Sequence, residues 1–308
     1  MTQTAQRVAV LGGGSFGTAL ANILADNGHN VYFWMRDPAA VEDVRTRHEN
    51  SKYLPGYKLN ANIVPTVSLS EAVSGSSVVF LAVPSKAMRL VARECRANSH
   101  PGQMFVSTSK GIEVDTFKLM SQVIREELPD ARVGVLSGPN LAKEIAVRML
   151  TSSVIASEDE GLRTTVQQLL SCKYFRVYAN IDVFGIELGG ALKNIYAIAS
   201  GMADALGMGE NTKSMLITRS LAEMSRFAAR LGANPLTFLG LAGVGDLIVT
   251  CHSPLSRNFR VGSGLAKGQK LEEILAHLGG TAEGVNTTAI VKKKADELQI
   301  YMPLVQGL

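Results

Sequence analysis

The chain has 308 residues, of which 46% are hydrophobic and 19% are charged, so it can bury a large core and is long enough for two domains. Lysine and arginine number 31 against 27 acidic residues, a net charge of +4 that suits a small anionic ligand and is too small an excess to indicate nucleic-acid binding. Three widely spaced cysteines (Cys95, Cys172 and Cys251) and five histidines without metal-ligand spacing indicate neither a disulfide framework nor a metal site.

The first part of the chain alternates short β-branched runs with helical patterns. The expected strands are residues 7–12, 30–35, 77–84, 103–109, 132–139, 152–157 and 174–180. Helical patterns fall between many of them, at residues 16–27, 85–97, 116–127 and 159–170. Near-continuous apolar strands that alternate with helices predict an α/β domain with a doubly wound parallel sheet of the Rossmann type.

From about residue 185 the strand signals stop and the pattern is helical. The expected helices are residues 186–206, 212–231, 235–240, 244–250, 256–266, 271–278 and 286–298. We therefore expect a dinucleotide-binding domain over residues 1–184 and an all-α substrate and catalytic domain over residues 185–308. The chain ends in the apolar run IYMPLVQGL, so we expect that a final helix beyond Leu308 is missing.

No apolar run reaches the eighteen or so residues of a membrane span. The first twelve residues, MTQTAQRVAVLG, also lack the pattern of a signal peptide. We expect a cytoplasmic protein without an integral membrane segment.

A glycine-rich stretch, Gly12-x-Gly14-x-x-Gly17, follows the first expected strand and opens a helix. Gly12 permits a tight turn, Gly14 lets the backbone approach a pyrophosphate, and Gly17 lets the helix pack close to the strand. Amide groups of the first helical turn, around Ser15 and Phe16, would hold the phosphates. The strand, the helix and the next strand stand at the spacing of a dinucleotide-binding unit, which favours that interpretation over a plain glycine turn.

The residues after the second strand bear on the choice between NAD and NADP. Asp37 lies twenty residues after Gly17, where an acid that binds the ribose hydroxyls would stand. It also precedes Pro38, and Asp-Pro is typical of a helix start at which the carboxylate is the cap. If Asp37 is a cap, Arg36 is the group best placed to face the ribose phosphate of NADP. This interpretation favours NADP and leaves the use of both cofactors open.

A lysine interrupts the most apolar helical pattern, in GGALKNIYAI (residues 189–198). Lys193 and Asn194 stand where a core helix normally carries aliphatic side chains. The lysine's neighbours on the helix face, two glycines before it and Ala197 after it, are all small. Two interpretations are open: the lysine reaches solvent at the helix edge, or the small residues leave room for a ligand beside it.

Further polar groups lie where packing does not explain them. Lys110 in VSTSKGIE and the turn SGPN, from Gly138 to Asn140, follow expected strands, and ligands of doubly wound sheets bind at the carboxyl ends of strands. Lys110 could equally be a surface lysine. In residues 241–269, Asp246 precedes Thr250 by four positions and shares its helix face.

The triplet Ser256-Arg257-Asn258 gathers hydrogen-bond donors at an expected helix start. Such a cluster suits the oxygens of a phosphate. The alternative is a serine that caps the helix, followed by a solvated arginine.

Taken in order, these motifs resemble the NAD(P)-dependent glycerol-3-phosphate dehydrogenases of the bacterial soluble type. The resemblance covers nearly the whole chain and rests on Gly12–Gly17, STSKGIE, SGPNLAKEIA, ALKN, GVGDLIVTC, LSRN and TAEGV (residues 281–285). KGIE and ALKN recur in looser form among related dehydrogenases. GVGDL followed by SRN is more specific to glycerol phosphate.

The resemblance implies reversible reduction of dihydroxyacetone phosphate to sn-glycerol 3-phosphate by NADPH or NADH, which supplies the glycerophospholipid backbone. Beside the glycine loop, it implies cofactor contacts from Ser15, Phe16, Arg36, Lys110, Ala142, Arg257 and Glu283. It implies substrate contacts from Lys110, Gly138, Asn140, Asp246, Ser256, Arg257 and Asn258, and it makes Lys193 the proton donor and acceptor. The chain departs from the family at Asn140, where serine is usual, and the family usually continues some tens of residues beyond Leu308. A homodimer is left open.

The resemblance explains why a lysine stands at position 193 of an apolar helix. Oxidation of a secondary alcohol needs a base at the hydroxyl, and a free lysine, with a pKa of about 10.4, is too protonated for that at neutral pH. Burial in an apolar helix lowers the pKa of a lysine. In reverse, the ammonium donates a proton to the forming alkoxide and stabilises its charge. We expect Asn194 and Asp246 to orient that ammonium.

Two other functions stay open at this point. A sister dehydrogenase, acting on a β-hydroxyacid or a sugar-acid phosphate, would share the fold and the helix lysine and would bind a carboxylate near the nicotinamide. A non-catalytic NADP-sensing protein would keep the glycine loop and would have no need of Lys193 and Asp246 together.

Overall fold

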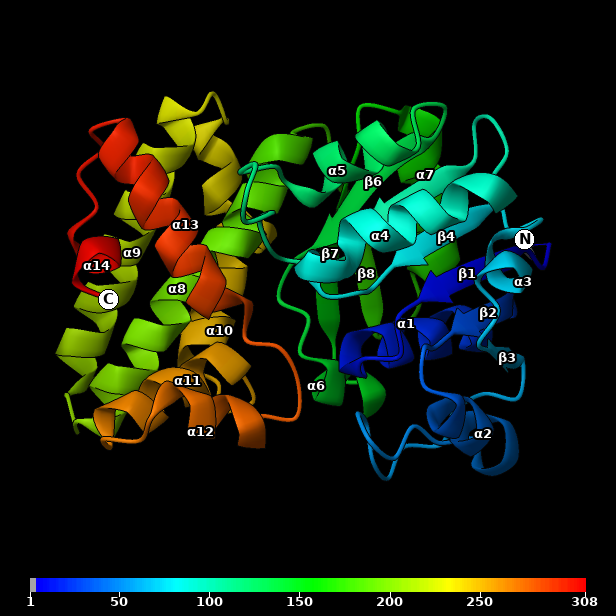
Figure 1. The fold of residues 1–308 in the computed structure, drawn as a ribbon, viewed down its shortest axis with the longest axis horizontal. Helices are drawn as coiled ribbons and strands as arrows, with labels where there is room; N and C mark the ends of the chain where they lie inside the picture. Colours follow the sequence, from blue (N-terminus) through cyan, green and yellow to red (C-terminus); the bar gives the residue numbers. More distant parts are fainter. Residues whose placement is uncertain (1–3) are drawn as a thin grey trace. The chain divides into compact units, whose positions relative to one another are not determined.

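The computed structural model describes residues 4–308, and its contacts divide them into two compact units (Figure 1). The first unit runs to Ser109 and continues through Met120–Leu136 and Asn140–Ile181. The second unit is Lys110–Leu119, Ser137–Pro139 and Asp182–Leu308. The boundary expected between residues 184 and 185 stays a prediction. The contacts of Lys110 and Gly138 assign both residues to the second unit, although each precedes that boundary.

The first unit is an eight-stranded sheet with helices on both faces. The strands are β1 (Arg7–Leu11), β2 (Asn30–Trp34), β3 (Ile63–Thr66), β4 (Val78–Leu81), β5 (Met104–Ser107), β6 (Arg132–Ser137), β7 (Thr151–Ala156) and β8 (Phe175–Asn180). They lie in the order β3-β2-β1-β4-β5-β6-β7-β8. The pairs from β3 to β6, and the pair β7–β8, are parallel. The first six strands have the order of a dinucleotide-binding fold, which confirms the predicted Rossmann-type domain.

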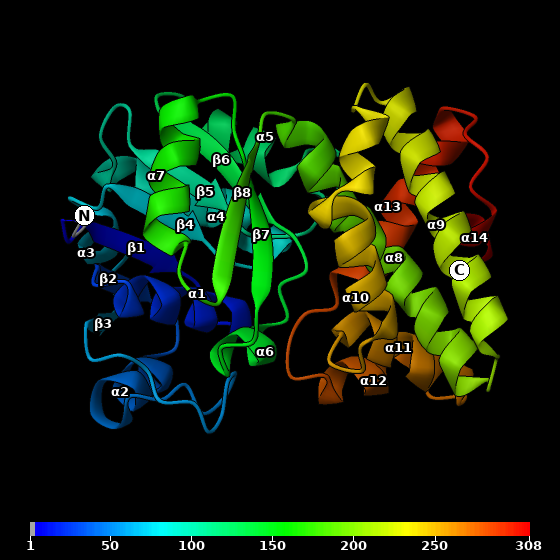
Figure 2. The same cartoon turned by 180° about the vertical axis from the view of Figure 1, so that it is seen from behind.

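Alternate residues of each strand face opposite layers of helices. Val8 and Val10 of β1 pack in one core with α1 (Ser15–Asp26), α2 (Pro38–Arg47) and α7 (Glu160–Leu170). Ala9 and Leu11 pack in the other core with α3 (Leu69–Val73), α4 (Ser85–Cys95) and α5 (Met120–Glu127). Accordingly, α4 lies before the sheet in Figure 1, and α7 lies before it in the reverse view of Figure 2.

Two elements of this unit differ from the sequence prediction. Strand β3 is not predicted, because it is short and contains Pro65, which is tolerated there since β3 is an edge strand that pairs only with β2. The helix expected at residues 116–127 begins at Met120. Phe117 has φ of 59° and Leu119 forms a bridge with Ile112, so the chain is not helical before Met120.

The second unit is helical and is built around one long buried helix, α8 (Val183–Ala205). Every residue from 185 to 198 is buried. Contacts with α8 come from α9 (Glu210–Arg230), α10 (Asp246–His252), α11 (Arg257–Ala266), α13 (Glu283–Glu297) and α14 (Pro303–Gly307), and α12 (Leu271–His277) packs on α11. This confirms the predicted all-α domain. The stretch expected as helix 235–240 is a 3-10 turn, Pro235–Leu239, and a π-helical turn, Leu241–Gly245, precedes α10.

Within residues 4–308, no helix has both the length and the apolar character that a membrane crossing requires.

Candidate functional site

The glycine loop at the start of α1 has the backbone geometry of a phosphate site. Gly12 has φ of 123°, and a Cβ atom there would lie 2.4 Å from the carbonyl oxygen of Ala82. A Cβ atom at Gly17 would lie 2.0 Å from the oxygen of Gly12, whereas one at Gly14 would meet nothing within 4 Å. Helix α1 begins at Ser15 without a side-chain cap. Open space beside Gly14 and uncapped amides at the helix start fit a pyrophosphate.

Asp37 is the N-cap of α2. One carboxylate oxygen accepts from the Ala39 amide at 3.0 Å, and the other faces the Lys52 ammonium at 3.4 Å. Arg36, its exposed neighbour, is not involved in this cap. The carboxylate of Asp37 is thus engaged within the protein, the condition under which the sequence favours Arg36 as the group for the ribose phosphate.

Three other predicted ligands lie in the first unit. The Ser15 hydroxyl donates to the carbonyl of Tyr53 at 2.7 Å, so its backbone amide is the group free for a phosphate. Phe16 and Ala142 pack against the same core, and Ala142 is the first residue of α6 (Ala142–Ala146).

Asn140, the residue that departs from the family pattern, follows the SGP turn. Its side-chain nitrogen donates to the Ser153 hydroxyl at 3.0 Å. Its side-chain oxygen is buried and has no hydrogen-bond partner among the described residues. The amide is therefore fixed at one end and can still accept a hydrogen bond at the other.

Two lysines of the second unit share one buried carboxylate. The Lys193 ammonium, in the middle of α8, donates to one oxygen of Asp246 and to the Thr250 hydroxyl, the latter at 2.7 Å. The Lys110 ammonium donates to the other oxygen of Asp246 at 2.6 Å and to the Gly138 carbonyl at 2.7 Å. The side chain of Asp246 is 1% exposed and that of Lys193 is 7% exposed. The cluster is a hydrogen-bonded network around a buried carboxylate, with one more positive than negative charge when both lysines are protonated.

Local structure brings these groups together. The π-helical turn before α10 leads into Asp246, the first residue of that helix, and Thr250 follows one turn later on the same face. The Thr250 hydroxyl donates to the backbone carbonyl of Asp246 at 2.6 Å, which directs its lone pairs to Lys193. The sequence indicates the shared face of Asp246 and Thr250, and the contact of Asp246 with Lys193 agrees with the expected orienting role, whereas the contact of Asp246 with Lys110 is not predicted.

The small residues around Lys193 serve packing within the protein. A Cβ atom at Gly190 would lie 2.8 Å from the Ser137 hydroxyl and 3.5 Å from the Lys110 side chain, and one at Gly189 would lie 3.0 Å from the Ala242 oxygen. At these two glycines the space that the sequence reserves for a ligand is therefore taken by the Ser137 hydroxyl and the Ala242 backbone. That interpretation of the glycine pair is wrong.

Burial lowers the pKa of Lys193 from 10.5 to about 7. The charge of Asp246 opposes this change, and the positive charge of Lys110 adds to it. Near neutral pH the amine is consequently present in both protonation states, as a group that gives and takes a proton must be.

A chain of amides runs beside the lysines. Asn194 donates to the carbonyls of Lys110 at 3.3 Å and Gly190 at 3.4 Å, and it accepts from Asn258 at 2.9 Å. The oxygen of Asn258 in turn accepts from the Gly284 amide at 3.0 Å. Asn194 makes no hydrogen bond to the Lys193 ammonium in the described part of the chain, so the expected orienting role belongs to Asp246 and not to Asn194.

The predicted phosphate-binding triplet lies at the start of α11. The Ser256 hydroxyl accepts from the Phe259 amide at 3.3 Å, so it is the N-cap that the sequence offers as an alternative. Arg257 opens the helix, and a Cβ atom at Gly280 would lie 2.3 Å from its guanidinium. Glu283 opens α13. The start of α11 offers backbone amides and the Arg257 side chain to an anion.

The described residues contain no group of three or more His, Cys, Asp or Glu side chains that could hold a metal ion. Their three cysteines are free.

Family models and individual relatives point to the same protein family. Residues 7–163 match the family model for the N-terminus of NAD-dependent glycerol-3-phosphate dehydrogenase, and residues 182–308 match the model for its C-terminus. The chain is 63% identical to the NAD(P)+ glycerol-3-phosphate dehydrogenase of Azotobacter vinelandii over 98% of this chain and 89% of the relative. It is 60% identical to that of Pseudomonas syringae over 99% and 89%.

Solved structures agree. The crystal structure of glycerol-3-phosphate dehydrogenase from Coxiella burnetii superposes with a TM-score of 0.94 at 34% identity, over 98% of this chain and 92% of that one. The yeast enzyme, from Saccharomyces cerevisiae, superposes with a TM-score of 0.85 at 28% identity, over 99% and 94%.

Proposed function

The chain belongs to the NAD-dependent glycerol-3-phosphate dehydrogenase family, and we propose that it reversibly reduces dihydroxyacetone phosphate to sn-glycerol 3-phosphate with Lys193 as proton donor and acceptor. One observation carries the assignment of Lys193. It is a buried ammonium whose pKa is lowered to about 7 and which is held by Asp246 and Thr250.

The reduction needs one hydride and one proton. The nicotinamide of NAD(P)H, when bound, supplies the hydride to the carbonyl carbon. As the new C–H bond forms, the electrons of the C=O bond move to oxygen, and the Lys193 ammonium donates its proton to that oxygen. The neutral amine left behind recovers a proton from solvent before the next reduction. In the oxidation, the neutral amine takes the proton of the alcohol.

Asp246 and Lys110 control the orientation and the protonation of Lys193 during this proton transfer. The Asp246 carboxylate fixes the Lys193 ammonium in direction, while Lys110, 2.6 Å from the same carboxylate, keeps a second positive charge nearby. That charge disfavours the protonated form of Lys193 and attracts the oxyanion that forms on reduction. The excess of one positive charge in the cluster also suits an anionic substrate.

The phosphate of the substrate is assigned to the start of α11. Asn258 uses its oxygen for Gly284 and one N–H for Asn194, and has a second N–H available. Together with Arg257 and the first amides of the helix, this gives a charged donor and neutral donors for phosphate oxygens. Ser256 would contribute through its hydroxyl, which caps α11 as an acceptor and can still donate, because its backbone amide donates to the Ser253 carbonyl at 2.9 Å.

Three finer properties remain predictions from the sequence: location in the cytoplasm, a homodimer, and supply of the glycerophospholipid backbone.

An assay of NADPH and NADH oxidation with dihydroxyacetone phosphate tests the proposed function. We expect rapid, substrate-dependent oxidation with at least NADPH. A panel of β-ketoacids and oxidised sugar-acid phosphates should support no comparable rate. Turnover of a panel member above that of dihydroxyacetone phosphate would contradict the proposal, as would NADPH binding without any turnover.

Arg36→Ala is expected to weaken NADPH binding and to leave NADH binding within about twofold. Only NADPH carries the ribose phosphate, and charge-assisted hydrogen bonds contribute about 1.5–3 kcal/mol each, or roughly ten- to a hundred-and-fifty-fold in affinity. The dissociation constants of both cofactors, from nicotinamide fluorescence, check this. Lys52→Ala, which removes the cation that faces Asp37, is the matched control. Equal losses of NADPH and NADH would mean that Arg36 is structural and that Asp37 is again a candidate for the ribose hydroxyls.

A further inference from the structure

Asn50 is a buried side chain that reaches the glycine loop from a distant part of the sequence. It lies between α2 and β3, is 0% exposed, and its side-chain nitrogen donates to the carbonyl of Gly13 at 2.8 Å. The same nitrogen donates to the Thr18 hydroxyl at 2.8 Å. Both N–H groups of this amide are therefore used on the loop and on the first turns of α1.

These bonds determine how the peptide groups of the loop are turned. In a planar trans peptide, the carbonyl of one residue points opposite to the N–H of the next. Holding the Gly13 carbonyl thus directs the Gly14 amide to the other side. Thr18 holds the next peptide group in the same way. Its hydroxyl donates to the Gly14 carbonyl at 2.9 Å, so the Ser15 amide of that peptide points in the opposite direction. Successive N–H groups turned away from engaged carbonyls make an anion-binding backbone.

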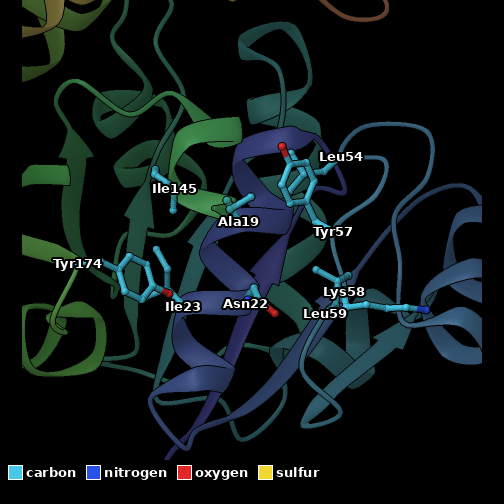
Figure 3. Close-up of a pocket in the computed structure, with 10 residues that line it drawn as sticks. Ala19, Asn22, Ile23, Leu54, Tyr57, Lys58, Leu59, Ile145 and Tyr174 are labelled. Carbon is cyan, nitrogen blue, oxygen red and sulfur yellow. The ribbon is translucent and has the colours of Figure 1, made fainter. Parts of the chain in front are cut away.

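The segment that carries Asn50 is fastened to α1 by packing as well. The Ser15 hydroxyl donates to the Tyr53 carbonyl, and Leu54 and Leu59 are buried. Figure 3 shows Leu54, Tyr57 and Leu59 from this segment beside Ala19 and Ile23 of α1. The cavity that these side chains line has a volume of about 10 Å³, room for one water at most. Its lining is therefore a packing surface, and the polar bonds of Asn50 are directed at the loop.

The oxygen of the Asn50 side chain adds a second observation. It is buried and has no hydrogen-bond partner among residues 4–308. A buried acceptor without a partner opposes folding, so an apolar side chain would serve better if Asn50 only filled space. What asparagine provides and an apolar side chain cannot is the pair of hydrogen bonds from its nitrogen to the Gly13 carbonyl and the Thr18 hydroxyl.

We propose that Asn50 is a positioning residue of the dinucleotide site, which fixes the Gly13 peptide so that the Gly14 amide faces the pyrophosphate. The proposal rests on the cofactor use stated under Proposed function. Because the pyrophosphate is common to all dinucleotides, Asn50 acts equally on NADPH and NADH, in contrast to Arg36.

Asn50→Asp is the sharpest variant, because it keeps the shape of the side chain and replaces its donor by an acceptor that faces the Gly13 carbonyl. We expect the dissociation constants of NADPH, NADH and ADP-ribose, measured by fluorescence and calorimetry without substrate, to rise by similar factors of roughly ten- to a hundredfold, from two lost hydrogen bonds. At saturating NADPH, kcat should stay within about threefold of wild type, since the variant leaves the lysine cluster untouched and a positioning effect on binding appears in KM.

Asn60→Ala is the matched control. The Asn60 side chain ties the same segment to the other end of α1 by donating to Asp26 at 2.9 Å, and it does not touch the glycine loop. It should lower the melting temperature without changing any cofactor dissociation constant. If Asn50→Asp fails to fold, Asn50→Leu removes both bonds of the side-chain nitrogen without placing a charge in the core and should give the same uniform loss.

Wild-type affinity in folded Asn50→Asp or Asn50→Leu would overturn the proposal, and so would an equal loss of affinity in Asn60→Ala. Failure of the proposed function is distinguishable, because wild type itself would then fail to bind NADPH or to oxidise it with dihydroxyacetone phosphate.

Discussion

Lys193→Met is expected to lower kcat for the reduction of dihydroxyacetone phosphate by about a hundred- to ten-thousand-fold, the contribution typical of a general acid or base. Methionine fills similar space in α8 and has no proton to give. The chain should still fold, because the substitution removes a buried ammonium and Asp246 keeps Lys110 as its partner. The dissociation constant of NADPH should be unchanged, because the glycine loop is not touched.

Lys292→Met is the matched control for this variant. Lys292 lies on α13, is half exposed and pairs with Asp296 at 2.7 Å. Its replacement should leave kcat within about twofold of wild type, because exposed ion pairs contribute little. Activity of Lys193→Met within a few-fold of wild type would remove Lys193 from the mechanism.

The second large effect is expected for Arg257→Ala. If its guanidinium binds the substrate's phosphate, KM for dihydroxyacetone phosphate should rise by roughly ten- to a hundred-and-fifty-fold, since charge-assisted hydrogen bonds contribute about 1.5–3 kcal/mol each. Turnover should fall as well, because binding of the remote phosphate helps to hold the reacting carbon. Steady-state kinetics at saturating cofactor measures both, and saturation matters because Arg257 is also a predicted cofactor contact.

Dihydroxyacetone, which has no phosphate, separates binding from damage to the fold. It should be a very poor substrate for wild type and should lose little more in Arg257→Ala. Arg260→Ala is the control on the same helix, since Arg260 donates to the Leu278 carbonyl at 3.3 Å and is not a predicted ligand. Equal losses with both substrates would exclude the start of α11 as the phosphate site.

The sheet and the glycine loop could be predicted because their signals are local. Apolar runs such as Val78–Leu81 are buried on both faces, and the glycines of the loop follow β1 directly. Strand β3 and the start of α5 could not, since Pro65 is tolerated only at a sheet edge and Phe117 adopts a left-handed conformation that no local pattern requires.

Of the lysine cluster, the sequence analysis predicts the pairing of Asp246 with Lys193, and residue spacing alone does not predict that Lys110 shares the same carboxylate. Lys193 and Asp246 are 53 positions apart, and Lys110 and Asp246 are 136 apart, so their shared carboxylate depends on helix packing. The same packing explains the two wrong inferences. A Cβ atom at Gly190 would meet the Ser137 hydroxyl at 2.8 Å, and Asn194 turns to the backbone of Lys110 and to Asn258 instead of to the Lys193 ammonium. The role of Asn50 is hidden for the same reason, since its target lies 37 positions away.

If Lys193 gives and takes the proton, the reduction and the oxidation should depend on pH in opposite ways. The pKa of Lys193 is about 7, because burial lowers it and the charge of Asp246 partly opposes that change. The neutral amine needed for oxidation is therefore lost as pH falls, and the ammonium needed for reduction is lost as pH rises. Accordingly, kcat/KM for sn-glycerol 3-phosphate should fall about tenfold per unit below pH 7, and that for dihydroxyacetone phosphate about tenfold per unit above it.

The most direct test is this pair of profiles in wild type and in Asp246→Asn. Removing the carboxylate removes the charge that raises the pKa of Lys193, so both limbs should move to lower pH, while the substrate's own phosphate titrates identically with either protein. We expect the two profiles to cross near pH 7 in wild type and to shift together in Asp246→Asn. Profiles without an inflection between pH 6 and 9, or inflections that do not move in Asp246→Asn, would contradict it.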